Sequence, residues 1–166
     1  MIFRSVAIAI LAFTPVSLSA PAFNLHDLVG AWEHGENYTE MPDGSRFEQF
    51  PGQKGMMIIL PDGHYIHGLV GGELPQVASG NIKDMTPQEA TAIATGVLLH
   101  MGKWTANPDK GTFTVSIERS SFPNFDGKQQ VRQVIGLDKN RLRYFNLLSS
   151  AGDGAKVYVE LHRIGK

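Results

Sequence analysis

The sequence predicts a mostly β domain, either a meandering barrel or a sandwich, with one amphipathic helix. Three observations lead to this fold class. Short segments with strand character recur at regular spacing, residues typical of turns separate them, and only one segment has helical periodicity. Strands and helices do not alternate along the chain, which argues against a parallel α/β sheet.

Strand-like segments follow one another from Ala31 to the end of the chain. The clearest hairpin joins residues 55–60 to residues 64–70 through Pro61-Asp62-Gly63, where the glycine supplies the positive φ that a tight turn requires. Residues 111–120 alternate between apolar and polar side chains, as a half-buried strand does. Further strands are expected from Ala31 onward and over residues 129–137, 141–148 and 156–164.

One helix is expected over Thr86–Met101. Thr86 is a suitable N-cap, Pro87 suits the first helical position, and Glu89 completes a capping box. The apolar residues that follow have helical spacing, and Gly102 is expected to end the helix. We expect this helix to lie against the side of the β domain or over one end of it.

The first 22 residues have the order of a secretory signal peptide. Arg4 precedes an apolar run from Val6 to Phe13, and small residues follow, with Ala20 and Ala22 as the small pair before a cleavage site. We expect cleavage after Ala22, with cleavage after Ala20 as the alternative. A buried N-terminal strand or helix is a further alternative. The predicted organisation is therefore a signal peptide over residues 1–22 and one domain over residues 23–166, periplasmic or secreted.

Composition limits the classes of function. The formal net charge is −1 and basic residues are not clustered, so we expect no nucleic-acid partner. No second apolar stretch is long enough to span a bilayer, so no membrane span is expected after signal cleavage. The chain has no cysteine, which excludes disulfides, thiolate catalysis and thiolate metal sites.

Several motifs together resemble one family. Gly30-Ala31-Trp32, after a short helical turn, resembles the Gly-x-Trp start of lipocalins. The wider pattern resembles the bacterial and fungal lipocalin-like domain family, and it spans nearly the whole of the predicted mature chain. This pattern comprises Leu28-Val29-Gly30-x-Trp32, Leu60-Pro61-Asp62-Gly63 and Ser121-Phe122-Pro123-Asn124-x-x-Gly127-x-x-Gln130-x-Arg132.

The resemblance implies a closed antiparallel lipocalin-like β-barrel of about eight strands with a cavity. It also implies that Gly30, Trp32 and Arg163 close one end, with Arg163 of the last strand against the Trp32 ring. Members of this family often carry a histidine near the positions of Val115 and Ser116, and this chain has none there. That departure weakens an enzymatic interpretation.

Glu118 and Arg132 are candidates for chemistry because they lie on neighbouring predicted strands. If both point inward, Glu118 could act as an acid with a raised pKa, or form a salt bridge with Arg132 that orients the adjacent turn. Arg132 could also bind a carboxylate on a ligand. The residues expected to contact a ligand are Tyr65, His67, Phe113, Glu118, Arg132 and Tyr144.

The histidines do not form a metal motif in the sequence. His64 and His67 are three apart on one predicted strand, so they point to opposite faces. A metal held by His67 would need distant ligands such as His100 or His162. We expect no metal and no cofactor.

The predicted function is extracytoplasmic binding of a small, largely apolar molecule inside the barrel. One alternative is a barrel isomerase or cyclase acting on a small hydrophobic substrate, with Glu118 as the candidate catalytic residue. The other is an envelope interaction protein without a ligand. Binding is favoured over catalysis, and the oligomeric state is left open.

Overall fold

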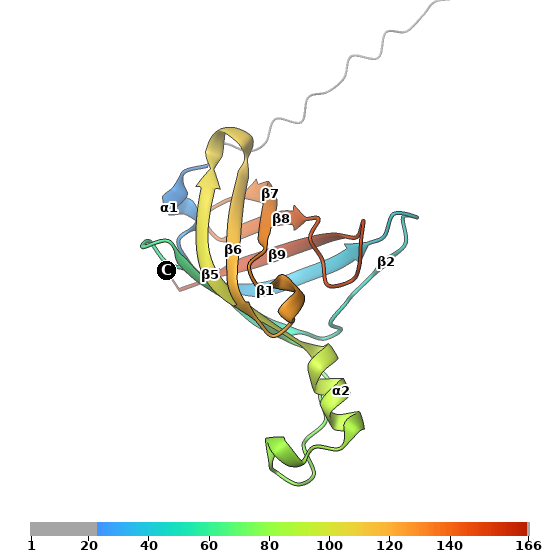
Figure 1. The fold of residues 1–166 in the computed structure, drawn as a ribbon. Helices are drawn as coiled ribbons and strands as arrows, with labels where there is room; N and C mark the ends of the chain where they lie inside the picture. The colour runs from blue at the N-terminus through green and yellow to red at the C-terminus, as the bar shows by residue number, and fades with distance from the viewer. Residues whose placement is uncertain (1–22, 166) are drawn as a thin grey trace, which may run out of the picture.

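The computed structural model describes residues 23–165 as a closed antiparallel β-barrel (Figure 1). The predicted signal peptide lies outside the described residues. Eight strands form the barrel: β1 (Gly30–Glu40), β3 (Lys54–Ile59), β4 (His64–Val70), β5 (Val97–Asn107), β6 (Thr112–Ser120), β7 (Gln129–Leu137), β8 (Arg141–Asn146) and β9 (Lys156–Ile164). The two-residue strand β2 (Arg46–Phe47) extends one edge of β1.

The barrel closes because β1 pairs on both sides. Its first half pairs with β3, and almost its whole length pairs with β9, from Ala31 opposite Ile164 to Glu40 opposite Lys156. Every other barrel strand pairs with the strand that follows it, which gives an up-and-down meander. The predicted closed antiparallel barrel of about eight strands is therefore confirmed.

The end of the barrel near α1 (Leu25–Leu28) is filled by the motif that carried the family resemblance. The Trp32 ring is fully buried and donates a 2.9 Å hydrogen bond from Nε1 to the carbonyl oxygen of Leu28. The Arg163 guanidinium lies 4.0 Å from the centroid of the Trp32 ring and donates to the Val29 carbonyl at 2.8 Å. A Cβ at Gly30 would lie 2.6 Å from Arg163 Nη1, so a side chain there would collide with the arginine.

Strand alternation sends one set of side chains into the barrel. The largest apolar members of this core come from seven strands and pack next to the Trp32 end. They include Met57, Ile59, Tyr65, Trp104, Phe113, Val134, Leu142 and Leu161. These side chains fill the barrel interior next to Trp32.

The helix prediction is correct at its start and wrong at its end. α2 spans Pro87–Gly96, with the Thr86 hydroxyl accepting from the Glu89 backbone N–H as the capping box predicted. Residues Val97–Met101 instead begin β5, whose inward positions alternate in steps of two. The apolar residues of this segment fit a helical stripe as well as a strand, and pairing with β4 and β6 decides for the strand.

The position expected for the helix is also wrong. No residue of α2 is buried, and α2 with the segment before it projects away from the barrel (Figure 1). Three short 3₁₀ helices lie in the loops, over Ile82–Asp84 (η1), Pro108–Lys110 (η2) and Pro123–Phe125 (η3). None of the helices between residues 23 and 165 has the length and apolar character to cross a bilayer.

Candidate functional site

A cavity lies in the barrel at the end away from Trp32. Six residues separate Trp32 from Thr39, which lines the cavity, so the two ends of β1 stand roughly 23 Å apart along the strand. The cavity has a volume of about 50 Å³. Its apolar walls come from Phe50, Leu69, Leu98, Phe125, Leu148, Val157 and Val159.

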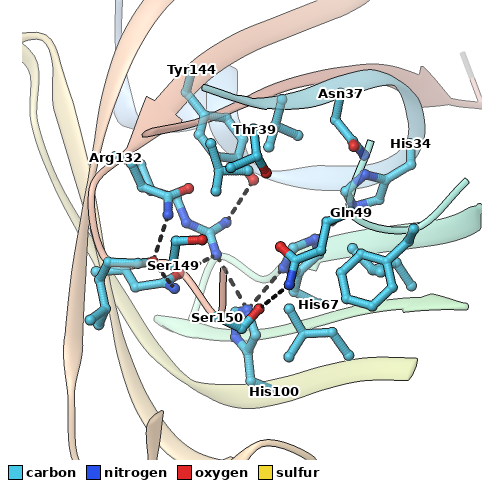
Figure 2. A pocket seen from close by; sticks show the side chains of 18 of the residues that line it. His34, Asn37, Thr39, Gln49, His67, His100, Arg132, Tyr144, Ser149 and Ser150 are labelled. Atoms are coloured by element: carbon cyan, nitrogen blue, oxygen red, sulfur yellow. Dashed lines mark hydrogen bonds between the residues drawn. The ribbon is translucent and has the colours of Figure 1, made fainter. Parts of the chain in front are cut away.

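Two loops cover this end. The loop between β1 and β3 carries Gln49, and the loop between β8 and β9 carries Ser150. Gln49 Nε2 donates a 2.7 Å hydrogen bond to Ser150 Oγ across the cavity, as Figure 2 shows. The same two loops supply Phe50 and Leu148 to the apolar walls. A molecule larger than the cavity would have to displace them.

Three histidines form the polar floor of the cavity. His34 comes from β1, His67 from β4 and His100 from β5. His67 and His100 are direct partners across the β4–β5 pair, and their Nδ1 and Nε2 atoms lie 3.0 Å apart. The Nε2 atoms of His34 and His67 lie 2.6 Å apart, with the two rings stacked at 4.8 Å between centroids. His100 Nδ1 lies 2.8 Å from the Tyr65 hydroxyl, which extends the chain one step deeper.

Burial keeps these histidines neutral. It lowers the pKa of His34 to about 4 and that of His100 to about 3, and the Arg132 charge adds to the effect in both cases. Burial also lowers the pKa of His67 well below its usual value, with smaller contributions from the neighbouring histidines and Arg132. Burial raises the pKa of the Tyr65 hydroxyl as well. At neutral pH these three histidines and Tyr65 are therefore uncharged hydrogen-bonding groups.

Arg132 is the charged residue of the site. Its side chain, from β7, is 1% exposed. One terminal nitrogen donates to the Tyr144 hydroxyl at 3.0 Å and to Met57 Sδ at 3.2 Å, and the other donates to Gln130 Oε1 at 3.0 Å. The guanidinium also lies over the rings of Tyr144 and Phe113, at 5.0 and 5.5 Å from their centroids.

The residues predicted to contact a ligand have different positions in the structure. His67, Arg132 and Tyr144 line the cavity. Tyr65 lies below them, beside His100, and Phe113 packs edge-on against Tyr144. These two support the site from the core.

The expectation that Glu118 points into the barrel is wrong. Phe113, Val115 and Ile117 are the buried residues of β6, so the alternation of the strand turns Glu118 to the exposed face. The residue opposite Arg132 on β6 is Phe113, which excludes the predicted pair of Glu118 with Arg132. Glu118 is therefore not the acid of an interior reaction.

The predicted separation of His64 and His67 is correct, because His64 is exposed and His67 is buried. His162 is exposed and contacts Glu160 on the outer surface, so it is no partner for His67. Within residues 23–165, no group of three or more potential ligand side chains has the geometry to hold a metal ion. The three interior histidines form a linear chain through different ring nitrogens and do not converge on one point.

Sequence reasoning did not identify His34 and Gln130 as site residues. His34 is two residues after Trp32 on the same strand, and Gln130 is two residues before Arg132, so alternation from either known inward residue would have identified both. The helix predicted through Met101 gave no indication that His100 lies on the inward face of β5.

Comparison with known proteins identifies the family. The model of the lipocalin-like domain family matches residues 29–161. The chain belongs to this family. No curated protein matches the chain in a sequence comparison.

Solved structures similar to this lipocalin-like domain include designed and natural barrels. A redesigned β-barrel is 17% identical, with a TM-score of 0.44 over 90% of this chain and 99% of the other. A bovine odorant-binding protein in complex with a selenium-containing odorant is 14% identical, with a TM-score of 0.45 over 95% of this chain and 79% of the other. A de novo fluorescence-activating β-barrel is 14% identical, with a TM-score of 0.42 over 84% of this chain and 95% of the other. At these identities the likeness concerns the fold alone.

Proposed function

We propose that this lipocalin-like domain reversibly binds a small molecule with an apolar body, held at the loop-covered end of the barrel. The observation that carries the proposal is the composition of the cavity. It combines apolar walls with a small set of polar groups, namely neutral histidines, amides, hydroxyls and one arginine. Small-ligand sites in proteins have this composition.

The size of the cavity sets how the ligand enters. Sites for drug-sized ligands enclose at least about 300 Å³, whereas this cavity encloses about 50 Å³. A few non-hydrogen atoms fit in the closed arrangement. A longer apolar chain would pass between the two covering loops and separate Gln49 from Ser150, whose hydrogen bond joins them.

The exposed position of Glu118 removes the residue on which the isomerase or cyclase alternative depended. Binding without chemical change is therefore the function that the geometry supports best. The alternative of an interaction protein without a ligand predicts no saturable binding of any small molecule, so one binding experiment separates the two.

Titration with the apolar fluorophore 1-aminoanthracene tests the proposal. We expect saturable binding at one site per chain. Leu69→Trp should abolish it, because Leu69 is buried on the cavity wall. Ile66→Trp on the same strand is the matched control, since Ile66 is 38% exposed and points outward. Binding that is unaffected by Leu69→Trp, or absent from the unmodified protein, would contradict the proposal.

We further propose that the domain acts outside the cytoplasm after removal of residues 1–22. Phe23 supports this proposal, because its side chain packs in the core directly after the predicted cleavage site. N-terminal sequencing of the chain recovered from the periplasm or medium of producing cells should give Phe23 as the first residue. A cytoplasmic chain that keeps residues 1–22 would contradict it.

A further inference from the structure

Among residues 23–165, Arg132 has no anionic partner. Its hydrogen-bond acceptors are a phenol, an amide oxygen, a thioether and an imidazole, all of them uncharged. None of the ion pairs among residues 23–165 involves Arg132, and no second charged side chain described in the structure lines the cavity. A buried charge without a counter-charge destabilises the folded protein.

The Nε atom of Arg132 is also unpaired. It is fully buried and has no hydrogen-bond acceptor, while the other guanidinium nitrogens have partners. The contact from the second terminal nitrogen to His100 Nε2 is the longest of the set, at 3.5 Å. An oxygen anion beside Arg132 could therefore accept from the unpaired Nε–H, because a guanidinium donates to carboxylates through Nε as well as through its terminal nitrogens.

The same arginine fixes the direction of the histidine chain. A guanidinium only donates, so His100 Nε2 is an acceptor and His100 Nδ1 carries the proton that points to Tyr65. His67 then donates from Nδ1 to His100 and accepts at Nε2 from His34. A neutral imidazole has one donor and one acceptor, so each step determines the next.

The row of hydrogen-bonded histidines ends at His34, where one acceptor has no partner. Because His34 donates from Nε2, its Nδ1 atom carries a lone pair, and that atom is buried without a partner. His34 and Arg132 line the same cavity, and Figure 2 shows both among its lining side chains. Two residues that line the cavity thus carry an unpaired donor, on Arg132, and an unpaired acceptor, on His34, and both atoms are covered in the closed arrangement.

We propose that the ligand is a small organic monoanion, whose carboxylate binds Arg132 and whose neighbouring hydroxyl or N–H donates to His34 Nδ1. This inference rests on the proposed binding function and specifies its ligand class. A single negative charge matches the single cation of the cavity. The apolar part of such a hydroxy acid or amino acid derivative would extend past Leu98 and Leu148 toward the loops.

Three matched eight-carbon probes test the inference by calorimetry at pH 7: 2-hydroxyoctanoate, octanoate and 1,2-octanediol. Octanoate lacks the hydroxyl donor, and the diol has no charge. We expect 2-hydroxyoctanoate to bind most tightly, octanoate about twofold to tenfold more weakly, and the diol at least about tenfold more weakly than 2-hydroxyoctanoate.

Two variants assign these differences to the named side chains. In Arg132→Met the hydroxy acid should lose its advantage over the diol, and in His34→Phe it should lose its advantage over octanoate. Arg119→Met is the matched control, because Arg119 is an exposed arginine on β6 outside the cavity, and it should leave all three affinities unchanged. Arg132→Met should also raise the urea midpoint of the ligand-free protein, because it removes an unpaired buried charge.

The outcomes separate this inference from the proposed function. If the diol and both acids bind equally, and Leu69→Trp abolishes all binding, the cavity binds small molecules but the carboxylate assignment is wrong. If none of the three binds and 1-aminoanthracene does not bind either, both proposals are wrong. Should Arg132→Met fail to fold, the probe series on the unmodified protein still decides the question.

Discussion

Acidification between pH 7 and pH 5 should strongly destabilise this protein, because three of its histidines are buried as neutral rings. The pKa of His34 is lowered to about 4 and that of His100 to about 3, and that of His67 is lowered well below its usual value. In the unfolded chain each histidine titrates near pH 6.5. Between these values the unfolded chain binds more protons than the folded protein, so the free energy of unfolding falls as the pH falls.

The magnitude follows from the two protonation equilibria. At pH 5 an unfolded histidine is almost fully protonated, whereas the folded His34 is protonated to roughly one-tenth. This difference removes about 2 kcal/mol of stability for His34 at pH 5, and about the same for each of the other two rings. The combined loss of about 6 kcal/mol is comparable with the whole stability of a typical domain, about 5–15 kcal/mol.

Carboxylates contribute little to the change in the free energy of unfolding between pH 7 and pH 5. The pKa values of Asp62, Glu89 and Asp138 are lowered mainly by hydrogen bonds to backbone N–H groups. Groups of this kind lose their stabilising contribution only as the pH falls through the acid range below about 4.5. Above pH 5 the histidines therefore dominate the slope.

Urea denaturation at half-unit intervals from pH 7.5 to pH 5 measures this slope. We expect uptake of nearly three protons on unfolding at the acid end of this range, and about one fewer in His34→Gln. A free energy of unfolding that is constant between pH 7 and pH 5, or a slope that His34→Gln does not alter, would refute the reasoning.

Three further predictions concern the frame around the site. Gly30→Ala should lower the free energy of unfolding by roughly 1–3 kcal/mol in urea titrations, because Gly30 has a φ of +140° and its Cβ would meet Arg163; a change below 0.5 kcal/mol would contradict it. Gln49→Ala should increase the dissociation rate of 1-aminoanthracene in stopped-flow experiments, because it removes the hydrogen bond to Ser150 between the covering loops; an unchanged rate would show that these loops do not limit release. Replacing residues 75–95 by a short glycine-serine linker should change the free energy of unfolding by less than about 1 kcal/mol, because α2 buries no residue; loss of folding would show that this projecting segment is part of the core.

Local patterns in the sequence were sufficient to predict most strands of the barrel. Alternation predicted β6, turn residues predicted the β3–β4 hairpin, and the capping box at Thr86 predicted where α2 begins. Each of these depends on residues within a few positions of one another, so the sequence determines it directly. The end of α2 was mispredicted because apolar residues such as Leu98 fit both a helical stripe and the inward face of a strand.

The residues of the site could not be grouped from the sequence alone, because tertiary structure brings them together. His34 and His67 are 33 residues apart, as are His67 and His100, and they meet only through strand register and the closure of β1 onto β3 and β9. The sequence by itself placed Arg132 and His67 on predicted strands and indicated a barrel with a cavity. The outward position of Glu118 follows from the alternation of residues 111–120. Only the folded barrel decided that Arg132 is buried without a counter-charge, because that depends on which residues lie opposite each other across strands, and local periodicity does not specify it.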